Sequence, residues 1–250
     1  MSTFALTLTA TKYNLIETAR VPIAVIGSIV FPTLALCLFV LPQRVVVDDS
    51  GFATAAVASM VVFAYMSSGL FSVGLELAEQ RAKPWAPYLR TLPGSPLARI
   101  GALILATLTI ATVAMVPLLV VGGLFTSARP EPLRLLAAIA LVILTALPPM
   151  LIGAIIGITT GPKAAIAVTQ VALFLLAFGG GLFLPPQMFP AWLDTASGAL
   201  PIRQAREIVV GTATGTAVPL WAVVGVVAWT LVLGALAVWL YRRDEGRRYR

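Results

Sequence analysis

The chain has 250 residues, of which 59% are hydrophobic and only 11% are charged, and its formal net charge is +7. Soluble domains carry about a quarter charged residues, so this composition excludes a water-soluble globular protein. Long apolar runs with few charges instead predict an all-α polytopic membrane protein. In a soluble protein the basic excess would favour nucleic acid. Here we attribute it to Lys and Arg retained on the cytoplasmic side of a membrane, and we expect no nucleic-acid partner.

The residue types needed for catalysis are largely missing. The sequence has no histidine, which removes the commonest general base and metal ligand. Cys37 is the single cysteine, so the chain cannot form an internal disulfide. The sequence also contains no clustered metal ligands and no phosphate-binding G-x-x-x-x-G-K-[ST] loop. We therefore expect a non-catalytic subunit with no metal and no cofactor of its own.

The N-terminal residues mix apolar and polar side chains. Phe4, Leu8, Leu15 and Ala19 share one face of a helix over residues 3–20. This pattern predicts an amphipathic helix on the membrane surface, and the alternative is a solvated tail. The chain does not open with the positive charge of a cleaved secretory signal, so we expect the first apolar run to be retained as a span.

Six apolar segments follow, each long enough to cross about 30 Å of hydrocarbon as a helix. The predicted spans are residues 21–41, 52–75, 99–125, 133–158, 164–184 and 218–241. Pro148 and Pro149 predict a kink in the fourth span, because they remove backbone donors. Gly153 and Gly157 have a spacing that lets helices approach closely, either between subunits or in ordinary packing within one subunit.

The Lys and Arg residues of the loops predict the orientation. One side holds Lys12, Arg20, Arg81, Lys83, Arg90, Arg99, Lys163, Arg242, Arg243, Arg247, Arg248 and Arg250. The other side holds only Arg44, Arg129, Arg134, Arg203 and Arg206. The positive-inside rule therefore predicts that both termini are cytoplasmic, in a cell (inner or plasma) membrane.

Charge within the predicted spans is nearly absent, and Glu76 lies only at the inner end of the second span. Ionisable residues inside spans mark proton and ion pathways. Their scarcity argues against a proton-coupled carrier or a voltage sensor. The energy for any transport should therefore come from another chain.

A charged, proline-marked segment, residues 76–98, separates the second and third spans. Its charged and aromatic positions include Glu79, Arg81, Lys83, Trp85, Tyr88, Leu89 and Arg90. Pro84 can open a short helix and Pro93 helps to close it. Two interpretations remain open from the residues alone: an aromatic belt at the membrane interface, or a docking helix for a cytoplasmic partner.

A second unusual segment, residues 182–217, precedes the last span on the predicted outer side. It is apolar but interrupted by Pro185, Pro186, Pro190 and Pro201. We expect a re-entrant helical pair dipping into the outer leaflet, provided that protein covers its irregular backbone. One helix would present Phe189, Trp192 and Leu193, and the other, within residues 202–210, would carry Arg203, Arg206 and Glu207.

In their order along the chain, these features resemble the ABC-2 type permease family, the membrane subunits of ATP-driven exporters that have a separate ATPase subunit. The first motif is Glu79, Arg81, Trp85, Leu89-Arg90 and Pro93 or Pro96. The second is Phe183-Leu184-Pro185, Pro190-Ala191-Trp192-Leu193 and Leu200-Pro201. The resemblance covers residues 1–250 as a single transmembrane domain. It departs at Pro84, where many members have glycine.

The resemblance implies roles for both segments. Residues 82–92 would form a coupling helix on the ATPase, with Glu17 or Lys12 of the N-terminal helix packing nearby. The outer gate would comprise Pro185, Phe189, Pro190, Trp192, Leu193, Pro201 and Arg203. The implied partners are two copies of an ABC ATPase, which would bind ATP and Mg, and a second permease, identical or homologous.

The expected cargo is a hydrophobic or amphipathic compound, such as a drug, antibiotic or lipid, because the spans offer almost no charge to an ion. The candidate path is Tyr65, Met66, Ser67, Ser68, Phe71, Thr145, Phe174, Phe178 and Met188, although methionine and aromatic residues in spans also serve ordinary packing. Two alternatives stay open: a lipid-linked glycan exporter of the same family, and a membrane scaffold subunit without transport.

Overall fold

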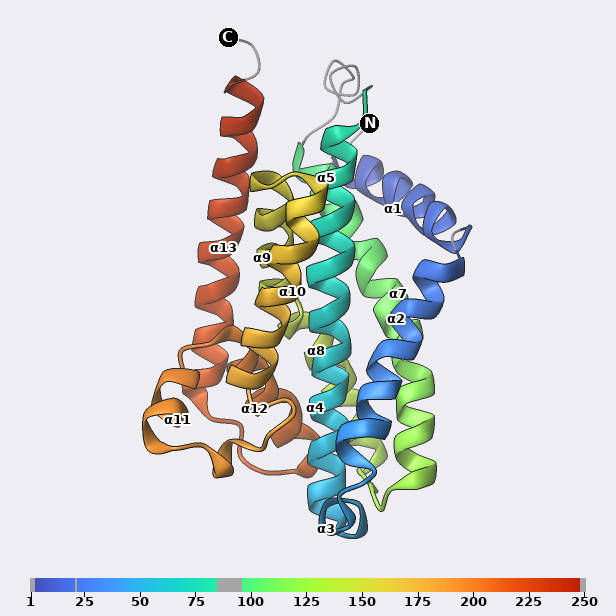
Figure 1. Cartoon of the computed structure of the whole chain (residues 1–250), viewed down its shortest axis with the longest axis vertical. Coiled ribbons are helices and arrows are strands. Elements are labelled where there is room, and N and C mark those ends of the chain that lie inside the picture. The colour runs from blue at the N-terminus through green and yellow to red at the C-terminus, as the bar shows by residue number, and fades with distance from the viewer. Residues whose placement is uncertain (1–2, 21, 85–95, 248–250) are drawn as a thin grey trace.

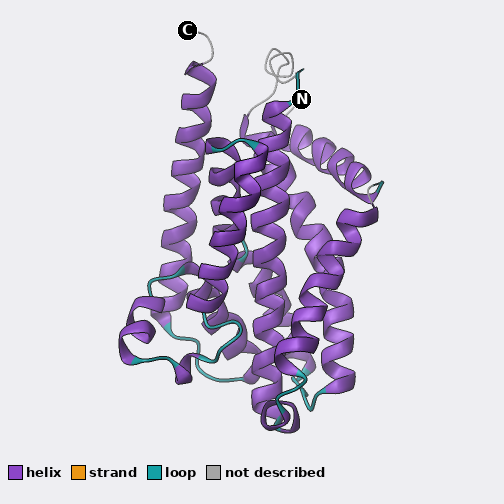
Figure 2. Ribbon diagram, in the orientation of Figure 1, coloured by secondary structure: helices purple, strands orange, loops and turns teal. Residues whose placement is uncertain are grey.

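The computed structural model describes residues 3–20, 22–84 and 96–247, and all regular elements among them are helical, with loops joining them (Figure 2). They form an elongated bundle (Figure 1). Helices α1 (Thr3–Ala19) and the end of α13 (Leu220–Arg247) lie at one end, which we call the terminal end. The opposite, or hairpin, end carries α3 (Arg44–Asp48), α11 (Ala191–Ser197) and α12 (Pro201–Thr214).

Five helical segments are long and apolar enough to cross a membrane, namely Ser50–Ala82, Ala98–Phe125, Pro132–Thr159, Pro162–Gly179 and Leu220–Arg243. The first predicted span corresponds to α2 (Pro22–Ala35) and a π-helical turn, η1 (Leu36–Val40), which together include a shorter apolar helix. Large apolar side chains stay exposed around the bundle, as lipid contact requires. The chain is therefore an all-α, multi-pass membrane protein, as predicted.

Two span boundaries differ from the sequence prediction. The second span does not end at residue 75, because α4 (Ser50–Ser68), η2 (Gly69–Val73) and α5 (Gly74–Ala82) form one continuous helix. The fifth, α10 (Pro162–Gly179), ends before residue 184. Gly181 follows it with φ 74°, a left-handed conformation that glycine adopts at little cost.

The fourth span is interrupted, as its proline pair predicts. Helix α8 (Pro132–Thr145) ends at Ala146, and α9 (Leu147–Thr159) starts with Pro148 and Pro149 in its first turn. Proline is tolerated there because the first turn of a helix has no intrahelical partner for its N–H groups.

Helix α9 packs closely against η2 and α5 through glycines. A Cβ added to Gly153 would lie 2.6 Å from the carbonyl oxygen of Gly69. One added to Gly69 would lie 2.7 Å from Cγ of Met150, and Gly157 is pressed against the carbonyl of Gly74. Of the two interpretations left open for Gly153 and Gly157, the structure supports packing within the subunit.

Gly153→Ala is expected to lower the free energy of unfolding by about 1–3 kcal/mol, because the new methyl group overlaps backbone atoms of the facing helix. Gly123→Ala, in α7 (Pro96–Phe125), is the matched control, since a Cβ there meets nothing within 4 Å. Both changes bring the same gain in helix propensity. Thermal unfolding in detergent should separate the two variants, and equal transition temperatures would contradict the close packing.

The predicted helical pair near the hairpin end is present as α11 and α12. Helix α12 packs against α4, α8 and α13, and its residues Ile202, Ala205 and Val209 are buried. The Trp229 indole on α13 donates a hydrogen bond to the Ala199 carbonyl oxygen at 2.8 Å. Protein therefore covers α12, as irregular backbone at membrane depth requires, whereas most of α11 and the residues just before it are exposed.

Candidate functional site

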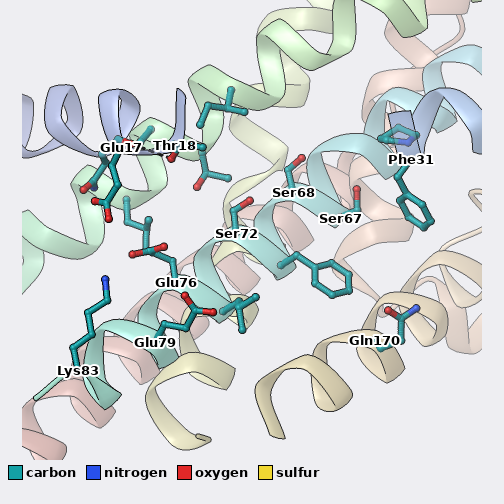
Figure 3. A pocket seen from close by; sticks show the side chains of 18 residues that line it. Glu17, Thr18, Phe31, Ser67, Ser68, Ser72, Glu76, Glu79, Lys83 and Gln170 are labelled. Carbon is teal, nitrogen blue, oxygen red and sulfur yellow. Dashed lines mark hydrogen bonds between the residues drawn. The ribbon is translucent and has the colours of Figure 1, made fainter. Parts of the chain in front are cut away.

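A cavity of about 690 Å³ lies between α1, α2, the α4–η2–α5 helix and α7, with one residue from α10 (Figure 3). Its charged lining residues are Glu17, Glu76, Glu79 and Lys83. Its polar lining residues are Asn14, Thr18, Ser67, Ser68, Ser72, Thr107 and Gln170. Its apolar lining residues are Phe31, Pro32, Phe71, Leu75, Leu103, Ala106 and Ile110.

The polar character of the cavity comes mainly from one face of the α4–η2–α5 helix. Ser68, Ser72, Glu76, Glu79 and Lys83 recur every three or four residues, which places them on the same side of a helix. Figure 3 shows the glutamates and the lysine together at one end, with the serines leading away from them. The cavity is therefore charged near the terminal end and loses charge with depth.

The deep part of the cavity contains hydroxyl groups that are free to bind a ligand. Ser68 is 6% exposed and Thr107 4% exposed, and neither has a hydrogen-bond partner within the described part of the chain. Most other hydroxyls in these helices are occupied: Thr112, for example, donates to the Leu108 carbonyl at 2.7 Å. The Ser68 and Thr107 hydroxyls open to the cavity, so a ligand or water there can pair with them without displacing a hydrogen bond within the protein.

The structure brings together only part of the predicted path. Ser67, Ser68 and Phe71 line the cavity. Tyr65 and Met66 are each 1% exposed and belong to the hydrophobic core, where the Tyr65 hydroxyl lies 2.7 Å from the Thr112 hydroxyl. These two face away from the cavity although they precede its serines directly in sequence.

The other predicted path residues lie elsewhere. Thr145 is buried at the end of α8 and its hydroxyl donates to the Val142 carbonyl at 3.3 Å. Phe174 and Phe178 are half-exposed on α10, and Met188, in the short helix η3 (Pro186–Met188), is exposed. These four residues do not line the cavity.

A series of phenylalanine rings runs from the cavity toward the loop after α10. Phe31, at the cavity, lies 5.6 Å from Phe63 between ring centroids. Phe63 lies 4.9 Å from Phe183, which also contacts Phe178 at 5.2 Å and Phe39 at 4.6 Å. The series joins α2, η1, α4 and α10 by apolar contact and carries no charge.

The predicted coupling residues fall into two groups. Glu79 and Lys83 line the cavity, and Arg81 donates from Nη1 to the Gly157 carbonyl oxygen at 2.8 Å. The remaining four, Trp85, Tyr88, Leu89 and Arg90, lie outside the described residues. Helix α5 ends at Ala82, the first residue of the predicted coupling helix, and Lys83 follows it in an extended conformation.

The predicted gate residues organise the hairpin end rather than the interior. Pro190 precedes α11 and Pro201 begins α12. Trp192 is 72% exposed, so its indole does not plug the bundle of this single chain. Phe189 and Leu193 are half-buried, and Pro185 lies directly before η3.

A charge network at the hairpin end connects α12 with α4. Glu207 accepts hydrogen bonds from Arg203 Nε at 2.9 Å and Arg206 Nη1 at 3.2 Å. Arg203 also donates to Asp194 at 3.0 Å. Arg206 is 5% exposed, and its Nε donates to the Ser59 hydroxyl at 3.1 Å. Burial lowers the pKa of the Arg206 guanidinium, and the charge of Glu207 opposes that shift.

Several lining residues were not predicted from the sequence as path residues: Asn14, Glu17, Thr18, Phe31, Ser72, Glu76, Thr107 and Gln170. Glu17 was expected near the coupling helix, and Glu76 was noted only as a boundary charge. The stripe of polar residues from Ser68 to Lys83 would have identified the α4–η2–α5 part of the cavity. The residues contributed by α1, α2, α7 and α10 depend on tertiary packing and leave no local pattern.

Comparison with known proteins agrees with this architecture. The sequence profile described as "ABC-2 type transporter" matches residues 5–214. The chain is also similar to a Bacillus subtilis (strain 168) protein named "Putative transport permease YvfS", with 23% identity over 192 residues, which cover 75% of this chain and 76% of the relative. The profile match extends over most of the helical bundle, including the cavity and both ends. The chain therefore belongs to the ABC-2 type transporter family and is a permease of an ABC transporter.

Proposed function

We propose that this permease exports a hydrophobic or amphipathic compound across the cell membrane, that a separate ABC ATPase subunit drives the export, and that the cavity is the cargo site. The observation that carries this proposal is the cavity itself. Sites for drug-sized ligands span about 300–1,000 Å³ and are mostly apolar with a few polar groups. The cavity has about 690 Å³ and matches this description.

One helix provides the mechanical connection that such transport needs. The α4–η2–α5 segment, Ser50–Ala82, passes from the hairpin end along the cavity to the terminal end. Arg81 ties its terminal end to α9, and Arg206 ties α12 to Ser59 in the middle of α4. A displacement applied to the residues after α5 would therefore move one wall of the cavity and reach α12.

The orientation and assembly follow from the same proposal. With both termini in the cytoplasm, the charged mouth of the cavity faces the cytoplasm, and the hairpin end faces outward. Residues 82–92 would receive the movement of the ATPase. Two ATPase copies and a second permease, identical or homologous, would complete the transporter.

The coupling assignment predicts a loss of assembly in the double variant Trp85→Ala/Arg90→Ala. Buried Trp and Arg residues at the centre of an interface contribute about 2 kcal/mol or more each, so losing both should weaken binding to the ATPase by roughly 1,000-fold. Co-purification and cargo-stimulated ATP hydrolysis would measure the change.

The matched control is Trp239→Ala/Arg243→Ala. This pair lies on α13, also toward the terminal end, with the guanidinium 5.2 Å from the ring centroid. Its removal takes away the same residue types without touching the proposed coupling segment. Full assembly and full stimulated ATP hydrolysis in the Trp85/Arg90 variant would show that this segment does not couple the two subunits.

A further inference from the structure

We infer that the cavity selects a cargo with a positive charge at one end of an apolar body, that is, a cationic amphiphile. The inference rests on the proposed function, because it assigns a substrate class to the proposed cargo site. It goes further, because a hydrophobic exporter need not distinguish the sign of its cargo's charge.

The charges at the cavity mouth are unbalanced. Glu17 comes from α1, and Glu76 and Glu79 come from α5, while Lys83 is the single basic residue among the described residues of the lining. The side-chain carboxylates of Glu17 and Glu79 make no ion pair and no hydrogen bond within the described chain. Glu76 accepts one hydrogen bond, at 2.8 Å, from the neutral amide of Gln80. The carboxylates are therefore available to a ligand.

The deeper lining fits the uncharged part of the same ligand. Phe31, Phe71, Leu103 and Ile110 supply apolar and aromatic surface. The partnerless hydroxyl of Thr107, 4% exposed, lies among them and can pair with a modest polar group. Because this hydroxyl opens into the cavity and has no partner in the described protein, it can bond to a ligand there without breaking an existing hydrogen bond.

The geometry orders the two parts of the ligand. A bound molecule would place its apolar body among the rings and its charge near Glu17, Glu76 and Glu79. Carboxylates beside low-dielectric walls focus a negative potential, which attracts a cation and repels an anion. An anionic compound of the same shape would meet like charges at the mouth and would bind more weakly.

Two ions of nearly equal size and shape test this selectivity: tetraphenylphosphonium, a cation, and tetraphenylborate, an anion. Equilibrium binding to the purified full chain in neutral detergent, corrected for empty micelles, is the measurement. The Glu76→Gln/Glu79→Gln variant is expected to bind the cation about tenfold more weakly, which corresponds to about 1.4 kcal/mol, and the anion no more weakly. Asp48→Asn, an exposed carboxylate at the hairpin end, is the control and should change neither.

Ser72→Trp separates failure of this inference from failure of the proposed cargo site. Ser72 is exposed to the cavity, so an indole there should obstruct it and remove binding of both ions. Cation selection is overturned, and the cargo cavity stands, under three joint results. The native chain binds both ions with equal affinity, the Glu76→Gln/Glu79→Gln variant binds them as tightly as the native chain, and Ser72→Trp binds neither. If neither ion binds, or Ser72→Trp changes nothing, the cargo site is overturned together with the inference.

Discussion

Ser72→Trp is expected to reduce ATP-driven transport by the assembled transporter to background. Ser72 lies on the cavity-facing stripe of the α4–η2–α5 helix and is exposed, and its hydroxyl makes no hydrogen bond within the described residues. An indole at this position fits without displacing core side chains and occupies the space that the cargo needs. Transport rates in reconstituted vesicles, compared at equal amounts of assembled complex, would measure the loss.

Thr109→Trp is the matched control for this change. Thr109 is an exposed residue of α7 that does not line the cavity and whose hydroxyl is bonded to its own helix. The same increase in side-chain volume is therefore placed against lipid, and transport should continue. If Ser72→Trp transported as fast as Thr109→Trp, the cargo would have to pass elsewhere.

Glu207→Gln is expected to lower the free energy of unfolding by about 3 kcal/mol, because it leaves a buried guanidinium without its counter-charge. Arg206 is 5% exposed, and Glu207 is its ion-pair partner within the described chain. Glu131→Gln is the control at the same end: it breaks a 3.0 Å pair with Arg134 in which both side chains are about half exposed. Such exposed pairs contribute about 0–1 kcal/mol.

A double-mutant cycle identifies the cause of the Glu207 effect. Arg206→Met removes the buried charge itself, so Arg206→Met/Glu207→Gln should be more stable than Glu207→Gln alone. Thermal unfolding and the fraction remaining monodisperse after heating are the measurements. Additive losses in the double variant would show that the ion pair is not the reason for the instability.

The spans could be predicted from the sequence because apolar length alone decides whether a helix crosses a membrane. The prediction failed where a charged run followed an apolar run without a helix breaker. Residues 76–82 look like a loop by composition, yet they continue the helix of the second span. Glu79 lines the polar cavity and Arg81 bonds to α9, so neither side chain has to face lipid. The fifth span was predicted to run to residue 184, but α10 ends at Gly179 and Gly181 then turns the chain with φ 74°.

The candidate site was harder to predict because it depends on which face of each helix turns inward. Tyr65 and Ser68 are three residues apart, yet the first is in the core and the second is in the cavity wall. The hydrogen bond between Arg206 and Ser59 joins residues 147 positions apart, and no local pattern records it. Such contacts are set by packing between distant helices.

The most direct test of the account is ATP-driven accumulation in inside-out vesicles that contain this chain and its ABC ATPase. One neutral, one cationic and one anionic hydrophobic compound should be offered, with initial rates measured with and without ATP. We expect at least one compound, with the cation fastest, to accumulate only when ATP and both subunits are present. Absence of accumulation for all three by an assembled, ATP-hydrolysing complex, or equal accumulation without this chain, would contradict export through its cavity.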